Sequence, residues 1–296
     1  MNKVQKISSL RAAVSAARKD KQTIAFVPTM GNLHEGHLEL VRVAKRRADM
    51  VVVSIYVNPT QFGANEDLDN YPSTPEEDAR ALAELGVDLL FLPSQETMYP
   101  GSSEDPGSID KQTRVYVPDM GDVYCGQDRP EHFYGVTTIV SRLFNMVQPD
   151  IAVFGNKDYQ QIAIIRRMVR DLAYPIQVEG VDTVRSEEGL ALSSRNGYLK
   201  AKELKVAPSF YQTLLSIADK LKEHTSKGKK LTKKVVKEIE KTASDQLKTK
   251  GFKPQYITVC RQYDLAPATK GDTELVILAA AVLGETRLID NVEVSL

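Results

Sequence analysis

The chain has 296 residues, of which 42% are hydrophobic and 26% charged, as is typical of a soluble globular protein with one or two domains. Lys and Arg together number 39, as do Asp and Glu, so no net charge recruits nucleic acid or an anionic membrane. Cys125 and Cys260 are isolated and far apart, which argues against a disulfide framework and a cysteine-based zinc site.

The first residues also argue against export. Residues 1–6 lead into a polar helix and carry neither the apolar core nor the cleavage site of a signal peptide. The longest apolar stretch, residues 275–283, is too short to span a bilayer. We therefore expect a reduced cytoplasmic compartment, with no membrane or nucleic-acid partner.

Short segments in the first half have the nearly continuous apolar character of strands that are buried on both faces of a parallel sheet. They are residues 23–27, 50–57, 87–93 and 150–155, with a last strand expected at 175–184. Helical periodicity or helix caps occur between them, at residues 38–47, 74–86, 135–147 and 157–172. This alternation predicts an α/β fold with a doubly wound parallel sheet.

The remaining segments have other patterns. Residues 94–113 are rich in Ser, Gly and Pro and are predicted to form a long polar loop. After about residue 185 we expect two long charged helices and then strands, at residues 201–223, 231–248, 255–260 and 274–283, before residues 288–291 close the chain. A domain boundary is therefore predicted near residue 184, followed by a smaller α+β domain.

The most informative segment is 28–37, Pro-Thr-Met-Gly-Asn-Leu-His-Glu-Gly-His, between the first strand and its helix. His34 and His37 are expected on one face of the first helical turn, and Gly36 lets a ligand approach the backbone. A helix N-terminus suits a phosphate, to which each imidazole can add a donor. The alternative is a helix start with two exposed histidines, but this spacing, in a chain with four histidines, favours a phosphate site.

Polar clusters follow two other predicted strands, at residues 58–62 and 155–161. Ligands of parallel α/β sheets bind at the carboxyl ends of the strands, so these clusters belong to the same candidate site. Gln61 and Gln161 can each donate and accept hydrogen bonds, which fits a small substrate with hydroxyls and a carboxylate.

Other residues fit a nucleotide. Gly155 lets the backbone approach it, Lys157 is a compact charge for a phosphate, and Asp158 could bind a ribose hydroxyl or cap the helix. Residues 192–196, Leu-Ser-Ser-Arg-Asn, could wrap a triphosphate or form a polar interdomain loop.

The segment 129–133 precedes the helix predicted at 135–147. Arg129 could pair with a carboxylate or a phosphate. His132 is expected to form hydrogen bonds at the helix start, and His224, at the end of a charged helix, is expected to be solvated.

The His-x-Gly-His segment resembles the HIGH signature of the nucleotidyl-transfer superfamily, which includes class I aminoacyl-tRNA synthetases and small cytidylyl- and adenylyltransferases. Residues 192–196 resemble the KMSKS-like loop of that superfamily, which clamps the β- and γ-phosphates. By itself the first resemblance implies only that an ATP or CTP α-phosphate is attacked nearby.

Over nearly its whole length the chain resembles the pantoate–β-alanine ligase (pantothenate synthetase) family. The resemblance rests on PTMGNLHEGH at 28–37, YVNPTQF at 56–62, RPEHFYGV at 129–136, residues 143–147, FGNKDYQQ at 154–161, GLALSSRN at 189–196 and GETRLIDN at 284–291. The chain departs from the family at Asn32, where Ala is usual, at Tyr56, where Phe is usual, and at Glu131, where Gly is usual. Glu131 adds a negative charge beside Arg129.

The resemblance implies a Rossmann-like domain over 1–184 that binds ATP and pantoate, a C-terminal lid domain over 185–296, and a homodimer. The implied ATP site consists of Met30, Gly31, Asn32, Leu33, His34, Glu35, Gly36, His37, Gly155, Asn156, Lys157, Asp158, Val184, Leu192, Ser193, Ser194 and Arg195. The residues expected to act in catalysis are His37, His34, Lys157, Ser193, Ser194 and Arg195.

On the substrate side, the resemblance implies that Gln61 contacts pantoate and β-alanine and that Gln161 contacts pantoate, with Asn58 and Arg129 also at the substrate. The implied reaction, in coenzyme A biosynthesis, has two steps. The pantoate carboxylate attacks the ATP α-phosphorus, with Mg²⁺ on the triphosphate, and the β-alanine amine then displaces AMP from pantoyl adenylate. Such chemistry needs positioning and charge stabilisation rather than a covalent enzyme nucleophile, and a closing domain would shield the anhydride from water.

Three other functions remain as alternatives. A nucleotidyltransferase would leave the nucleotide on its product and release no AMP. A nucleotide-sensing module with a dead site would lack His34, His37, Lys157 or Arg195, and all four are present. A tRNA synthetase is disfavoured by the zero net charge and by the lack of an anticodon-binding domain.

Overall fold

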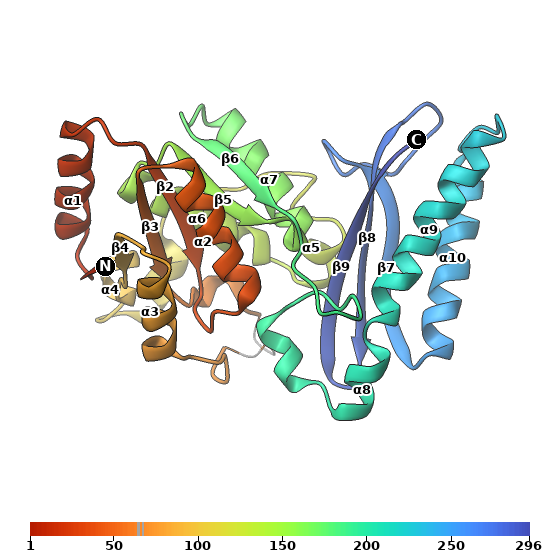
Figure 1. Cartoon of the computed structure of the whole chain (residues 1–296), viewed down its shortest axis with the longest axis horizontal. Helices are drawn as coiled ribbons and strands as arrows, with labels where there is room; N and C mark the ends of the chain where they lie inside the picture. The colour runs from red at the N-terminus through yellow and green to blue at the C-terminus, as the bar shows by residue number, and fades with distance from the viewer. Residues whose placement is uncertain (64–65, 67) are drawn as a thin grey trace. The chain divides into compact units, whose positions relative to one another are not determined.

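The computed structural model describes residues 1–63, 66 and 68–296, which form two compact units (Figure 1). The first unit comprises Met1–Asn156 and Ile164–Asp182, and the second comprises Lys157–Ala163 and Thr183–Leu296. The second unit thus includes the start of a helix that a single boundary near residue 184 assigns to the first domain.

The first unit is built on a parallel sheet of six strands in the order β1-β4-β3-β2-β5-β6, which confirms the predicted fold class. The strands are β1 (Asn2–Val4), β2 (Ile24–Thr29), β3 (Met50–Ile55), β4 (Leu89–Phe91), β5 (Ile151–Gly155) and β6 (Gln177–Val181). From β2 the order runs outward through β3 and β4 to β1, and from β5 it runs in the opposite direction to β6. The carboxyl ends of β2 and β5 therefore form a topological switch point, where open α/β sheets bind ligands.

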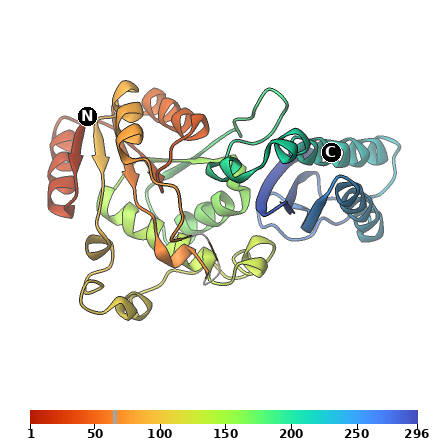
Figure 2. The ribbon, with the colours of Figure 1, turned by 90° about the horizontal axis from the view of Figure 1, so that it is seen from below.

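Helices cover both faces of this sheet (Figures 1 and 2). On one face, α2 (Glu35–Arg47) and α3 (Pro75–Glu84) pack Leu40, Val41 and Leu82 against alternate strand residues such as Val27 and Val53. On the other face, α6 (His132–Val147) packs against β2 and α1 (Ile7–Lys19). Both faces of the central strands are buried, which explains their continuous apolar sequence.

The segment predicted as a long loop is more ordered than expected. It contains α4 (Gln95–Met98) and the 3₁₀-helix η2 (Pro106–Lys111). The Ser94 hydroxyl caps α4 by accepting from the Thr97 N–H at 3.1 Å, and the Glu96 carboxylate accepts from the N–H groups of Gly101 and Ser103. Three more short helices are η1 (Pro59–Gln61), α5 (Cys125–Asp128) and η3 (Asn156–Asp158). The helix α7 (Tyr159–Asp171) follows η3 directly.

The second unit has an antiparallel sheet of β7 (Phe252–Arg261), β8 (Glu274–Leu283) and β9 (Thr286–Ser295). Its helices are η4 (Ser194–Tyr198), α8 (Ala201–Val206), α9 (Ser209–Ser226) and α10 (Lys233–Thr249). The single helix predicted over 201–223 is wrong, because Pro208 has no N–H to continue α8 and a new helix starts after it. Among the residues that the structure describes, no helix is both long and apolar enough to cross a membrane.

Candidate active site

The two histidines of the segment 28–37 form a reciprocal cap at the start of α2. His34 is the N-cap residue, and its Nδ1 accepts a hydrogen bond from the Gly36 N–H at 3.1 Å. The Nδ1 of His37 accepts from the His34 N–H at 3.3 Å, and the ring centroids are 4.1 Å apart. Because both Nδ1 atoms accept, each neutral ring carries its proton on Nε2. The cap therefore fixes the tautomer in which Nε2 is the donor.

Glycine at position 36 is also needed for the packing of the His34 ring, in addition to the predicted approach of a ligand. A Cβ at this position would lie 2.8 Å from Cε1 of His34, so only glycine leaves room for the capping imidazole.

The turn before His34 is held by Asp78, which the sequence analysis missed. This carboxylate, in the first turn of α3, is 2% exposed. Its Oδ2 accepts from the Asn32 N–H at 2.8 Å, and its Oδ1 accepts from the Leu33 N–H at 2.8 Å and from the Thr74 hydroxyl at 3.0 Å. Asn32 has a φ of 51°, in the left-handed region, which Asn tolerates better than the Ala that is usual in the family. Asp78 thus fixes a turn that is unfavourable by itself.

At the end of β3, Asn58 organises Gln61. Asn58 is 1% exposed, and its Nδ2 donates to Gln61 Oε1 at 3.0 Å and to the Gly135 carbonyl at 3.2 Å. Its Oδ1 accepts from the hydroxyls of Tyr99 at 2.7 Å and Thr60 at 3.1 Å. The Asn58 amide is therefore saturated within the first unit, whereas the Nε2 of Gln61 donates to none of the described residues.

Gly135 allows this contact between η1 and α6. A Cβ there would lie 2.4 Å from the Thr60 carbonyl oxygen, a distance that backbone atoms cannot accommodate.

Arg129 pairs with Glu66, a partner that the sequence analysis did not name. Its Nε and Nη2 donate to the Glu66 carboxylate at 2.6 and 2.5 Å, and Nη2 also donates to the Gln61 carbonyl at 3.2 Å. Burial acts to raise the pKa of Glu66, but hydrogen bonding and charge from Arg129 outweigh it and lower the pKa. Nη1 of Arg129 lies 3.1 Å from His132 Nε2, which must accept, so His132 Nδ1 donates to the Gln61 carbonyl at 2.8 Å.

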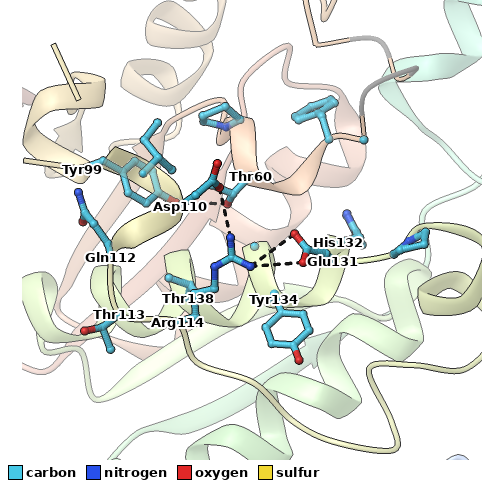
Figure 3. A pocket seen from close by; sticks show the side chains of 16 residues that line it. Thr60, Tyr99, Asp110, Gln112, Thr113, Arg114, Glu131, His132, Tyr134 and Thr138 are labelled. Carbon is cyan, nitrogen blue, oxygen red and sulfur yellow. Dashed lines mark hydrogen bonds and ion pairs between the residues drawn. The ribbon is translucent and has the colours of Figure 1, made fainter. Parts of the chain in front are cut away.

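Glu131 does not disturb this arrangement. Its carboxylate lies 3.4 Å from Arg114, which also pairs with Asp110 at 3.2 Å (Figure 3). These residues border a cavity of about 390 Å³, whose lining includes Thr60, Tyr99, Arg114, Glu131, His132 and Tyr134. Among the residues described, Asn58 and Gln61 are not part of that lining. The cavity therefore borders η1 but does not contain the two side-chain amides that were predicted to contact substrate.

In the second unit, the predicted phosphate ligand Lys157 is held through its main chain. The Lys157 carbonyl accepts from Asn291 Nδ2 at 2.9 Å, and its Nζ lies 3.7 Å from Asp158 Oδ2. The side-chain amide of Gln161 bonds to none of the described residues. Asn156, in the first unit, donates to Asp182 at 3.3 Å.

Residues 184–196 form an ordered turn. The Leu192 N–H donates to the Val184 carbonyl at 2.9 Å, and Arg185 and Ala191 form an antiparallel bridge. Ser193 caps η4 by accepting from the Arg195 N–H at 3.2 Å, which orders the Ser-Ser-Arg sequence.

The candidate residues thus form two ordered sets. Residues 30–37, 58–61 and 155–156 lie at or just after the carboxyl ends of β2, β3 and β5. Because these strands are parallel, the three segments share one edge of the first unit's sheet. The set in the second unit consists of residues 157–158, Gln161, Val184 and residues 192–195.

Comparisons with known proteins agree with this architecture. The family model described as Pantoate-beta-alanine ligase matches residues 2–293. The pantothenate synthetase of Pseudomonas putida (strain W619) is 52% identical over 100% of this chain and 98% of its own. The crystal structure of pantothenate synthetase from Thermus thermophilus has 42% identity and a TM-score of 0.87, with both chains fully covered. That of pantoate-beta-alanine ligase from Francisella tularensis, complexed with "Beta-gamma ATP and Beta-alanine", has 31% identity and a TM-score of 0.77 over 99% of this chain and 97% of that one. The chain belongs to the pantoate–β-alanine ligase family.

Proposed function

We propose that this enzyme condenses (R)-pantoate with β-alanine in two steps, using ATP. A pantoate carboxylate oxygen attacks the α-phosphorus, and the bond to the departing pyrophosphate breaks, which gives pantoyl adenylate. The β-alanine amine then attacks the acyl carbon, loses a proton, and expels AMP. The complex of the Francisella relative with an ATP compound and β-alanine supports both co-substrates.

The observation that carries the proposal is the fixed histidine pair at the start of α2. Two imidazoles whose Nδ1 atoms both accept are set to donate from Nε2 at the positive end of a helix, beside the switch point of the sheet. In this proposal residues 30–37 hold the nucleotide, and His37 and His34 stabilise the negative charge that develops on the ATP phosphates during adenylation. Donors fixed before the reaction cost no reorganisation in the transition state.

On the acceptor side, Gln61 is proposed to contact pantoate and β-alanine through its Nε2, and Gln161 to contact pantoate. The geometry supports an indirect role for Asn58 and Arg129. The Asn58 amide is saturated and the Arg129 guanidinium is neutralised by Glu66, so both fix Gln61 instead of offering a group to substrate.

The second unit is proposed to supply the rest of the ATP site. Lys157 and Arg195, with the hydroxyls of Ser193 and Ser194, would contact the triphosphate, and the backbone at Val184 and Leu192 would contact the nucleotide together with Gly155, Asn156 and Asp158. Among the described residues, no cluster of three His, Cys, Asp or Glu side chains could hold a metal ion. Mg²⁺ binds through phosphates, water and one or two carboxylates, so we expect it to enter with ATP.

We also propose, from the family resemblance, that the protein is a cytoplasmic homodimer whose C-terminal domain acts as a lid. Sedimentation equilibrium over a range of concentrations tests the dimer.

A product assay tests the function. Incubation with ATP, Mg²⁺, pantoate and β-alanine should yield AMP and pantothenate in equal amounts. No pantothenate should form when pantoate or β-alanine is omitted. A product that retains the nucleotide would favour a nucleotidyltransferase instead.

A further inference from the structure

Two buried polar residues stand out on β9. Asp290 and Asn291 are 4% and 8% exposed, in a strand whose neighbouring residues Leu288 and Val294 belong to the apolar core. Buried Asp and Asn are uncommon in strands and need partners for their polar atoms. The hydrogen-bond partners of both residues are, or lie close in sequence to, the residues proposed to contact ATP.

Asn291 is tied to η3, directly before α7. Its Nδ2 donates to the Lys157 carbonyl at 2.9 Å. The Asn291 backbone N–H donates to Asp290 Oδ1 at 2.8 Å, which fixes the Asp290 carboxylate against the strand. Two residues further along the same face of β9, Glu293 accepts from the Tyr159 hydroxyl at 2.9 Å. One face of the strand therefore holds the Lys157 carbonyl and the Tyr159 side chain, which lie on either side of Asp158 in the sequence.

Asp290 points to the opposite face and is tied to the turn 184–195. Its two oxygens accept from Arg185 Nη1 at 2.6 Å and Nη2 at 2.8 Å, in a bidentate pair. The same guanidinium donates to the Gly189 carbonyl at 3.2 Å and lies 3.4 Å from the centre of the Tyr211 ring. Since Arg185 is bridged to Ala191, this pair fixes the turn that leads directly into Ser193.

We propose that Asp290 and Asn291 are positioning residues for adenylation, which hold Lys157 and the Ser193–Arg195 turn at a fixed spacing on one strand. Neither residue touches ATP in this account. Adjacent residues on a strand point to opposite faces, so one rigid element can set both phosphate-binding segments before ATP arrives. The entropy of ordering these segments is then lost on folding rather than on binding. The inference rests on the proposed roles of Lys157 and Arg195.

Asn291→Ala removes one tie without leaving a buried charge. The Lys157 carbonyl loses its donor, and the KM for ATP in pantoate-dependent pyrophosphate exchange should rise about tenfold. The attack of β-alanine on preformed pantoyl adenylate should change less than twofold. Thr286→Val is the matched control, because Thr286 is 2% exposed on the same strand and its hydroxyl has no partner among the described residues. It should leave both steps unchanged.

A double-mutant cycle separates positioning from general destabilisation. In a Lys157→Ala background, adding Asn291→Ala should change the exchange less than twofold, because the positioned group is already gone. For Asp290, the conservative Arg185→Lys keeps the charge but loses the bidentate fork, and its effect should likewise shrink in an Arg195→Ala background. Fully additive effects in both cycles, or equal losses in the two half-reactions, would overturn the inference.

Failure of the proposed function can be distinguished from failure of the positioning role. If the wild type forms no pantothenate, or if Lys157→Ala and Arg195→Ala exchange normally, the assigned site is wrong. If those variants are impaired but the cycles are additive, only the positioning role is wrong.

Discussion

Asp78 should control both the stability of the enzyme and its affinity for ATP. Replacing it with Asn keeps the shape of the side chain but leaves one acceptor oxygen where two backbone N–H groups, of Asn32 and Leu33, now each donate at 2.8 Å. One of these N–H groups would face an NH₂ group instead. Losing a hydrogen bond to a charged group costs about 1.5–3 kcal/mol. Because Asn32 and Leu33 are only partly buried, water can compensate in part, and we expect a loss of about 2 kcal/mol.

Urea denaturation measures this loss as a change in the free energy of unfolding. The same loosening should raise the KM for ATP in pyrophosphate exchange about tenfold, since the turn that carries the left-handed Asn32 is no longer fixed. Glu77→Gln is the control, because Glu77 is exposed in the same first turn of α3 and its removal also deletes one negative charge. If Asp78→Asn matches this control in both assays, the role given to Asp78 is refuted.

Three further predictions concern the histidine pair, the recognition of pantoate and the Glu66–Arg129 ion pair. His37→Ala should slow adenylation about 10²–10³-fold without unfolding the protein, and near-normal single-turnover adenylation would contradict the assignment. A deoxy-pantoate that lacks the hydroxyl bound by the site should be used roughly 10⁴-fold less efficiently than pantoate, and Gln161→Ala should erase much of this difference. Equal use of pantoate and deoxy-pantoate by the wild type would rule out the recognition role of Gln161. The lowered pKa of Glu66 contributes stability that is fully present above its ordinary value of 4.5 and is lost as the pH falls through the lowered pKa. Glu66→Gln should therefore flatten the acid side of the pH–stability curve, and an unchanged slope below pH 4.5 would show that the pair with Arg129 does not stabilise the fold.

The sequence predicts those strands and helices whose hydrophobic pattern extends over enough residues to be recognised. The strands around residues 24–29, 50–55 and 151–155 are apolar because both of their faces are buried, and this composition identifies them. The strand β1 has three residues, too few for a period, and the extent of β9 is hidden by polar residues in its middle. The sequence does not reveal the break at Pro208, because charged residues of helical propensity before it are followed directly by the apolar period of Phe210, Leu214 and Ile217.

The site is predictable where it is local. The turn from β2 to α2 has its histidines, its glycine and its helix cap within residues 28–37, so the sequence alone is enough to propose a phosphate site there. The residues that fix it come from elsewhere: Asp78 lies 46 positions after Asn32, and Glu66 lies 63 positions before Arg129. No local pattern distinguishes such a carboxylate from a solvated one. The family resemblance included residues 284–291 without a role for them, and their contacts with Lys157 and Arg185 provide one.

The central claim is that pantoyl adenylate forms before β-alanine reacts, and isotope exchange tests it most directly. With pantoate and Mg²⁺ present and β-alanine absent, labelled pyrophosphate should exchange into ATP, and without pantoate it should not. Arg195→Ala should weaken this exchange, because the proposed guanidinium contact to the departing pyrophosphate would be lost, but should barely affect the attack of β-alanine on preformed adenylate. Exchange that strictly required β-alanine would contradict the account and indicate a concerted reaction, or pyrophosphate retained until the amine binds.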